Sequence, residues 1–302
     1  MKSRSTALTR RHTWRALLPV TLLAAATLPA PAITNGEVDT DNRHANVGAV
    51  VLVNDLPDYP EYPAPHVFSS GTLIHPRVLL TAGHLVDQVE RAVAAGLGTL
   101  DDLRVSFGVN AYDPATWLEV AAIAKHPAYD SRFAEVPGGV AGLPDIGVVI
   151  LKEPVTDVPL GQLPSPFLLD DLLQAGQLRN VSSGAAHFPV VGYGRHITFP
   201  PSRAEDRPDG LRRFTHSGFK ALRSDWLLLS TVWARGYGGN ADHDSGGPIF
   251  WQDSVTGQLT LVAVVSGGDI HDVAHASSSR VDTPAALSFI EAVIEAVEGD
   301  QD

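Results

Sequence analysis

Short apolar runs recur along the chain between clusters of glycine, proline and aspartate. Each run is four to eight residues long and rich in valine, leucine and isoleucine. Runs of this length, separated by turn residues, are typical of strands in an all-β barrel or sandwich. They fall into two sets, one at residues 48–53, 67–74, 78–81, 118–124 and 146–151, the other at residues 188–193, 226–232, 248–251 and 259–266.

The segments between and after these sets have other patterns. Residues 153–186 show little alternation and predict a linker between two β domains. Residues 198–213, which hold prolines and many charges, predict an exposed loop. A helix is predicted near the C-terminus, capped by Asp282 or Thr283 and opened by Pro284. Its apolar positions recur at helical spacing: Ala286, Leu287, Ile290, Val293, Ile294 and Val297. A weaker helical pattern covers residues 85–95.

The first 32 residues differ in composition from the rest. Five basic residues precede an acid-free apolar run at 16–28, which ends in Ala30-Pro31-Ala32. This pattern predicts a signal peptide over residues 1–32 and therefore a secreted protein. The alternative is a membrane anchor, but the run is short for crossing a bilayer. Arg10-Arg11 also suggests twin-arginine export, although the residues that follow match that signal loosely.

Charge and cysteine content narrow the set of partners. Removing residues 1–32 takes the formal net charge from −12 to −17. A surface with this much negative charge repels nucleic acid and anionic membranes. We therefore expect neither of them as a partner once the signal peptide is removed. The chain has no cysteine, so its fold depends on its core rather than on disulfides. Its length is enough for two ordinary domains.

Three separated segments hold the candidate chemistry. Ser245 stands between an acid and two glycines, and the glycines let a substrate backbone approach a nucleophile closely. His84 follows the apolar run at 78–81, and Asp145 precedes the run at 146–151. A histidine that takes the serine proton, oriented by a buried carboxylate, would make Ser245 reactive. The alternatives are a turn serine, a core histidine and a capping aspartate.

The order of the three residues along the chain distinguishes between the known classes of serine hydrolase. His, Asp, Ser is the chymotrypsin order, whereas α/β-hydrolases and subtilisins use other orders. The G-x-S-x-G motif of α/β-hydrolases is absent, because His243 lies two residues before Ser245. An esterase of that fold is therefore disfavoured.

On these motifs the chain resembles the trypsin and chymotrypsin family over residues 33–299. Residues 69–74 resemble the strand before the catalytic histidine, and Thr81-Ala82-Gly83-His84 resembles the TAAH motif of the family. Residues 145–149 are similar to its DIALL motif, residues 190–194 to the strand that opens its second barrel, and residues 265–268 to the strand that pairs with substrate.

The resemblance implies an all-β fold of two six-stranded antiparallel β-barrels, with the active site between them and a C-terminal α-helix. Residues 33–165 would form the first barrel, and residues 166–302 the second barrel and the helix. It also implies a secreted serine endopeptidase that hydrolyses protein or peptide substrates without a cofactor or metal. His84, Asp145 and Ser245 would be its catalytic triad.

The same resemblance assigns an oxyanion hole to the backbone N–H groups of His243 and Ser245. The family carries glycine at the first of these positions, and histidine adopts a positive φ only at a cost. The hole would then be strained or formed only with substrate. Alternatively, His243 lines the cleft as a pH-sensitive substrate contact.

The resemblance to the trypsin and chymotrypsin family also assigns substrate-binding positions. Gly239, followed by Asn240, stands where trypsin-like members carry an acid, so a small or apolar side chain is expected before the cleaved bond. Asp242 lies near the entrance of that pocket. Gly267 replaces a tryptophan common in the family, and Gly268 keeps the pairing with substrate backbone. Ser266 is expected to hydrogen-bond Asp145.

Residues 33–36 resemble the mature N-terminus of the family. There the new amino group of the first residue, here Ile33, pairs with the acid before the serine, here Asp244. Ile33 directly follows Ala32. We therefore predict that signal peptidase itself creates the activating terminus.

Two other functions compete with this interpretation. The histidine at position 243 favours a non-catalytic protease-like binding protein, and an esterase or narrow processing enzyme could use the same site. His271, Asp272 and His275 match no zinc-site spacing and indicate a solvated loop. The oligomeric state is not defined by the sequence.

Overall fold

The computed structural model describes residues 33–55, 63–136, 138–179, 187–198, 203–204, 207–269, 271 and 274–300. The predicted signal peptide lies outside these residues. None of the described helices is long and apolar enough to cross a membrane.

The first six long strands close into a barrel. They pair in the order β2-β3-β4-β7-β6-β5, all antiparallel. Their bounds are β2 Val47–Leu52, β3 His66–His75, β4 Val78–Thr81, β5 Leu103–Ser106, β6 Trp117–Lys125 and β7 Gly147–Leu151. Leu73, Leu79, Leu103, Val120 and Val149 fill its interior, because alternate residues of every strand point inward.

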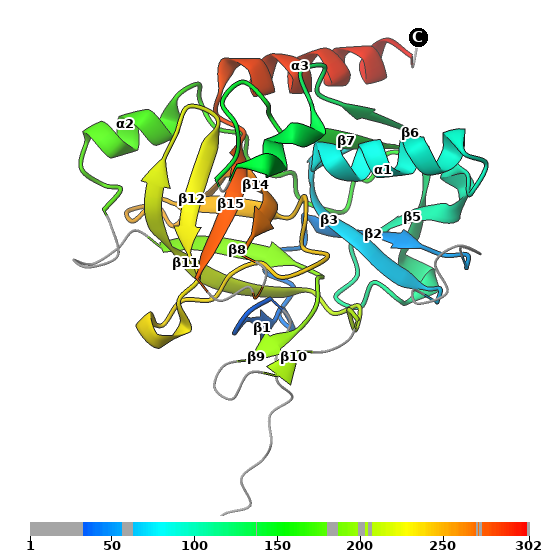
Figure 1. Ribbon diagram of the computed structural model, residues 1–302. Coiled ribbons are helices and arrows are strands. Elements are labelled where there is room, and N and C mark those ends of the chain that lie inside the picture. The colour runs from blue at the N-terminus through cyan, green and yellow to red at the C-terminus, as the bar shows by residue number, and fades with distance from the viewer. Residues whose placement is uncertain are drawn as a thin grey trace, which may run out of the picture.

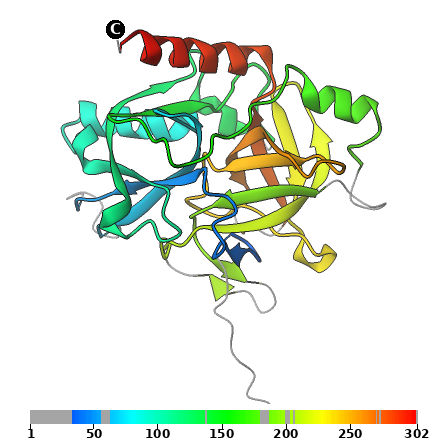
Figure 2. The same cartoon turned by 180° about the vertical axis from the view of Figure 1, so that it is seen from behind.

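A second barrel follows it in the chain. The strands β8, β11, β12, β15, β14 and β13 pair in that order, and β8 pairs with both β13 and β11, which closes the ring. Their bounds are β8 His187–Gly192, β11 Arg213–Leu222, β12 Trp226–Ser230, β13 Pro248–Gln252, β14 Leu259–Gly268 and β15 His275–Arg280. The short β1 (Glu37–Val38) extends β11, and β9 (Ile197–Thr198) pairs with β10 (Arg203–Ala204). The predicted fold of two six-stranded barrels is confirmed (Figures 1 and 2).

Three of the long strands were not predicted. β5 reads Leu-Arg-Val-Ser, with a charge between its two apolar residues, and β11 has polar and charged residues between its apolar positions. β15 reads His-Ala-Ser-Ser-Ser-Arg, which has no apolar alternation, yet five of its six residues are buried. Each of the three strands pairs on one side with the next or preceding strand of the chain and on the other side with a more distant strand. Their burial depends on both neighbours, so their own sequences do not show it.

The C-terminal helix α3 (Pro284–Gly299) is confirmed. The Thr283 side chain accepts a hydrogen bond from the backbone N–H of Ala286, so Thr283 is the cap rather than Asp282. Its apolar face joins a core that includes residues of both barrels. The helix lies along one edge of the molecule, above the first barrel in Figure 1. The weaker helical pattern is confirmed as α1 (Gly83–Ala94).

The predicted linker between the domains contains a helix that the sequence analysis missed, α2 (Leu168–Gln174). Two of its leucines, Leu169 and Leu172, are buried against the second barrel. Asp282 accepts the backbone N–H of Leu169, and Arg280 bonds Asp170 and Asp282. These contacts hold the helix against the barrel. Four short 3₁₀ helices complete the described chain, at Leu100–Asp102, Pro114–Thr116, Ser131–Glu135 and Trp233–Arg235.

The prediction of an exposed loop at residues 198–213 is wrong at its C-terminal end. Arg212 is fully buried between the barrels. Its guanidinium bonds Asp39 at 2.9 Å, the Val47 and Phe107 carbonyls at 3.0 and 3.1 Å, and the Tyr193 hydroxyl at 3.1 Å. One arginine therefore joins the N-terminal segment to both barrels, because its Nε and Nη1 groups reach buried acceptors in all three parts of the chain.

Asp39 is the anion of this network and is 1 % exposed. Burial tends to raise the pKa of Asp39. The backbone N–H groups of His44 and Arg43, which bond the carboxylate at 2.9 Å, and the charge of Arg212 outweigh burial, so the pKa lies below its ordinary value. The carboxylate is thus charged inside the fold near neutral pH.

Candidate active site

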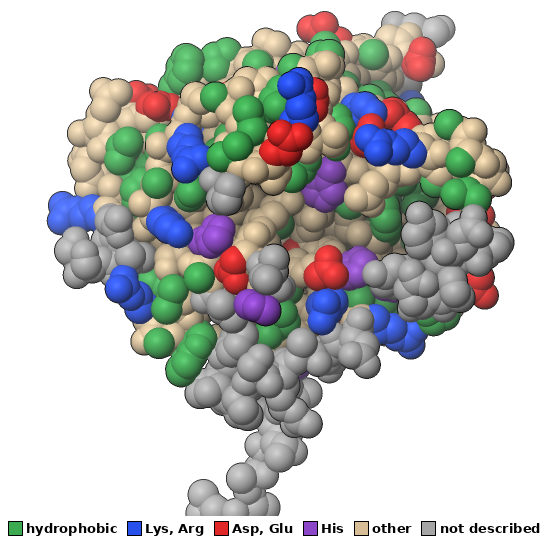
Figure 3. Space-filling model, viewed as in Figure 1, with side chains coloured by type: hydrophobic (Ala, Val, Ile, Leu, Met, Phe, Trp, Pro, Cys, Tyr) green, Lys and Arg blue, Asp and Glu red, His purple; other side chains and the backbone are tan. Residues whose placement is uncertain are grey.

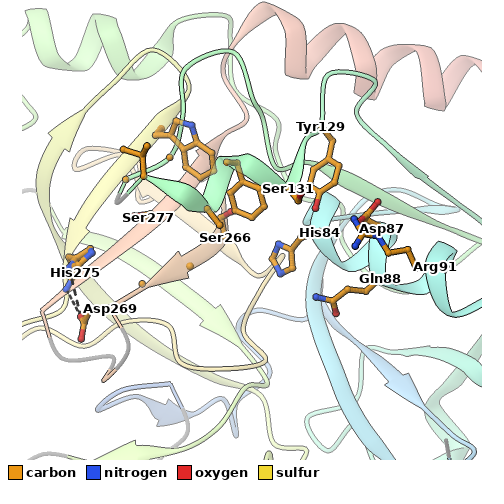
Figure 4. A pocket seen from close by; sticks show the side chains of 18 residues that line it. His84, Asp87, Gln88, Arg91, Tyr129, Ser131, Ser266, Asp269, His275 and Ser277 are labelled. Atoms are coloured by element: carbon orange, nitrogen blue, oxygen red, sulfur yellow. Dashed lines mark hydrogen bonds and ion pairs between the residues drawn. The ribbon is translucent and has the colours of Figure 1, made fainter. Parts of the chain in front are cut away.

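His84 lies where the first barrel meets its helix. It is the second residue of α1, directly after β4 and the turn through Ala82. Gly83 makes this sharp turn possible, since a Cβ there would lie 2.9 Å from the Ile146 carbonyl oxygen. The His84 ring is 16 % exposed and borders the cleft between the barrels. In Figure 4 the ring lies between Ser266 and the Gln88 side chain of α1.

Asp145 is completely buried two residues before the start of β7. Its carboxylate accepts the backbone N–H of His84 at 2.7 Å through Oδ1 and contacts His84 Nδ1 at 2.7 Å through Oδ2. The Ser266 hydroxyl also donates to Oδ2, which is the hydrogen bond expected from the sequence. The backbone N–H of Asp145 donates to Ser279 Oγ at 3.0 Å. Both barrels therefore hold this carboxylate in place.

The surroundings of His84 favour its charged form. Burial tends to lower the pKa of His84, but the charge of Asp145 and its hydrogen bond to Nδ1, together with the charge of Asp87, outweigh burial and raise it. An imidazole held in this way keeps its proton on Nδ1 and leaves Nε2 to accept another.

Ser245 comes from the second barrel, three residues before the start of β13. Its carbonyl accepts the backbone N–H of Ser70 at 3.0 Å, which ties this turn to β3 of the first barrel. Gly246, the next residue, has φ of +79°, and a Cβ there would lie 2.0 Å from Thr81 Oγ1. Only glycine fits, so the turn is fixed beside the strand that leads to His84.

Ser245 and His84 line the same cavity of about 720 Å³. Within the described part of the chain, no hydrogen bond joins the Ser245 hydroxyl to His84. In free enzymes such contacts are often long and shorten when substrate binds. The structure thus pairs His84 with Asp145 and brings Ser245 to the same cleft from the other barrel.

His243 takes up the positive φ that the sequence analysis anticipated, +69°. Its ring is 13 % exposed and packs edge-on against the ring of His66, with 4.7 Å between ring centroids. Burial lowers the pKa of His243, although the charge of Asp242 and a hydrogen bond with the Phe68 backbone oppose this. Burial also lowers the pKa of His66, to about 4. Both rings are therefore neutral near pH 7.

The predicted pocket-floor residues precede the turn that carries Ser245. Gly239 forms a two-way backbone bridge with Thr34, at 2.8 and 3.2 Å, and a Cβ on it would lie 2.1 Å from the Thr231 methyl group. No side chain fits there. Asn240 is 5 % exposed, and its Nδ2 lies 3.5 Å from the Gly267 carbonyl oxygen. Asp242 is exposed, 3.6 Å from Arg195.

The residues predicted for activation are both buried. Ile33 packs among the apolar residues of the second barrel and is 0 % exposed. The Asp244 carboxylate accepts the backbone N–H groups of Gly194 at 2.7 Å and Ala241 at 2.8 Å. The bridge between Thr34 and Gly239 holds the N-terminal segment beside the loop that leads to Asp244 and Ser245.

A second cavity of about 640 Å³ opens on the other side of His84. One wall is the end of β14, with Ser266, Gly267 and Gly268. The position of Gly267 is open, since a Cβ there would have no neighbour within 4 Å. In the space-filling view, histidine and charged side chains surround the hollow between the barrels (Figure 3).

The opposite wall holds aromatic residues that the sequence analysis missed. The Phe133 ring stacks on His84, with centroids 5.9 Å apart, and on Trp226, at 5.7 Å. Trp226 is 1 % exposed and donates to the Val140 carbonyl at 2.9 Å. Phe133 lies in a segment without apolar periodicity, so no sequence signal placed it beside His84.

No group of three metal-ligating side chains occurs among the residues that the structure describes. Of the cluster read as a solvated loop, Asp272 lies outside the described residues. His275 belongs to β15, with its Nδ1 3.9 Å from Asp269, so at this residue the loop prediction is wrong.

Comparison with known proteins gives one family. The family model described as Trypsin matches residues 40–212, more than half of the chain. The match includes His84 and Asp145 and ends before Ser245. A comparison with curated proteins finds no match.

Proposed function

Because the chain belongs to the trypsin family, we propose that it is a secreted serine endopeptidase that hydrolyses peptide bonds through Ser245, His84 and Asp145. The observation that carries this proposal is the contact of His84 Nδ1 with Asp145 Oδ2, 2.7 Å long, on a fully buried carboxylate. An uncompensated buried carboxylate is costly, and here its donors orient it toward the imidazole.

The reaction follows from this arrangement. Ser245 Oγ attacks the carbonyl carbon of the substrate while His84 Nε2 accepts the hydroxyl proton. The backbone N–H groups of His243 and Ser245 stabilise the oxyanion. His84 then gives its proton to the leaving amine as the carbon–nitrogen bond breaks. Water, activated by the same imidazole, releases the acyl group from Ser245.

We expect a fluorophosphonate probe to label the mature protein at one site, Ser245. Ser245→Ala should not be labelled, and Ser254→Ala, at an exposed hairpin position, should be labelled like the native chain. Mass spectrometry locates the label. Cleavage sites mapped in casein should show small or apolar residues before the cut, because Gly239 offers no charge there. Absence of labelling in the native protein would contradict catalysis and favour the protease-like binding protein.

Export and activation belong to the same proposal. Signal peptidase cleaves after Ala32, and the new amino group of Ile33 pairs with Asp244, so no separate activation step is needed. Both residues are buried, and the bridge between Thr34 and Gly239 holds the N-terminal segment beside the loop that leads to Asp244, which supports this. N-terminal sequencing of the secreted protein should begin at Ile33. A mature N-terminus at any other residue would contradict activation by signal peptidase.

A further inference from the structure

The cavity that holds Ser245 extends away from β14, along α1. It shares His84, Gln88 and Arg91 with the cavity beside β14, so the two form one cleft that passes His84. A peptide that pairs with the end of β14 on one side of His84 must continue into the α1 side. The predicted pocket for the residue before the cleaved bond adjoins β14, because Asn240 Nδ2 lies 3.5 Å from the Gly267 carbonyl oxygen. The part of the peptide that continues on the α1 side is therefore the part released as the amine.

The walls of the α1 side are largely apolar. Leu85, Val89 and Ala92 lie one and two turns apart along one face of α1, and all three border the cavity. Leu52 of β2, Phe68 of β3 and Leu97 after the helix border the same cavity. Val89, Ala92 and Phe68 are only partly buried, so they still have apolar surface to cover.

Polar residues border this side as well: His66, His243 and Asp242 near Ser245, and Thr99 and Asp102 after the helix. Near Ser245 the rings of His66 and His243 are neutral near pH 7 and pack against each other. Where the two cavities meet, Arg91 is paired with Asp87 at 2.6 Å. An apolar interior with polar groups at its borders is the usual chemistry of a pocket for an apolar side chain.

We propose that the α1 side of the cleft binds the substrate residue that follows the cleaved bond, and that it selects a large apolar side chain such as leucine or phenylalanine. This rests on the proposed function, because the identity of the occupant depends on Ser245 being the attacking atom. Covering part of Val89, Ala92 and Phe68 with such a side chain removes apolar surface from water.

Binding to Ser245→Ala tests this without any turnover. Titration calorimetry would compare four amine products that differ at one residue: Leu-Ala-amide, Phe-Ala-amide, Gly-Ala-amide and Asp-Ala-amide. We expect the leucine and phenylalanine compounds to bind about ten-fold more tightly than the glycine compound, which corresponds to about 1.4 kcal/mol. The aspartate compound should bind no better than glycine.

Ala92→Trp, added to Ser245→Ala, fills the α1 side of the cleft from a half-buried position. It should reduce the ratio of affinities between the leucine and glycine compounds to less than about two-fold. Val255→Asp, at a residue that is 90 % exposed on the hairpin between β13 and β14, should leave it unchanged. Melting curves show whether each variant is folded. Equal affinity for all four compounds, or a preference that survives in folded Ala92→Trp, would overturn the inference. A native protein that binds these compounds but hydrolyses nothing would contradict the proposed function alone.

Discussion

Replacing Asp145 with asparagine should lower kcat for peptide hydrolysis about 10⁴-fold. The backbone N–H of His84 requires an acceptor at Oδ1, so the amide oxygen of asparagine must occupy that position. Its NH₂ group then faces His84 Nδ1 and donates to it. The imidazole proton is forced onto Nε2, where the base is needed, and His84 can no longer accept the proton of Ser245.

The pH profile separates this effect from a loss of structure. With Asp145 present, its charge raises the pKa of His84 against burial, so activity should decline as pH falls through a value above the ordinary pKa of about 6.5. In Asp145→Asn burial acts without that charge, and the residual activity should decline at a lower pH.

Ser266→Ala provides the matched control, because it removes one hydrogen bond to the carboxylate and leaves the charge. Its kcat should fall far less than that of Asp145→Asn. Stopped assays from pH 4 to 9 would measure all three proteins. An asparagine variant with more than about a tenth of native kcat, or an unmoved acidic limb, would argue against His84 as the base.

Replacing Arg212 with methionine should lower the free energy of unfolding by about 3–5 kcal/mol. The substitution leaves the Asp39 carboxylate buried without its cation, and it removes one hydrogen-bond donor from each of the Val47 and Phe107 carbonyls. For a protein of this size the melting temperature should fall by about 6–20 °C. Denaturant titration and calorimetry would measure both quantities.

The neighbouring Arg213 offers a matched comparison. It is also buried, but its partner Asp209 has a side chain that is 30 % exposed, so water can solvate the carboxylate when the arginine is lost. Arg213→Met should therefore cost clearly less than Arg212→Met. The double variant Asp39→Asn with Arg212→Met should recover part of the loss, since no uncompensated charge remains. Equal costs at the two arginines would show that the buried charge is not the cause.

Local patterns were sufficient wherever a feature depends on neighbours in the chain. Strands such as β4 and β7 could be predicted because their own side chains are continuously apolar. The capped α3 could be predicted from Thr283 and Pro284. The candidate site could be predicted as three short motifs in a characteristic order, because each motif shapes its own turn: Gly83 before His84, and Gly246 after Ser245.

Features that depend on distant partners could not be predicted in this way. Arg212 was assigned to an exposed loop because its neighbours are charged. It is buried because Asp39, about 170 positions earlier, supplies its counter-charge. The serines of β15 are buried because strands on both sides satisfy their backbone groups. Phe133 and Trp226 form one wall of the cleft only because a loop of the first barrel reaches over the second.

The sequence by itself determined the candidate residues for the chemistry, the order in which the chain presents them, and a fold of two barrels. Tertiary structure alone decided how they are held: Asp145 fixed by donors from both barrels, His243 packed against His66, and an apolar groove along α1 beside Ser245. The physical reason is that hydrophobic spacing and turn residues act within a few positions of the chain. Hydrogen-bond partners and cavity walls are supplied by segments that meet only when both barrels have closed.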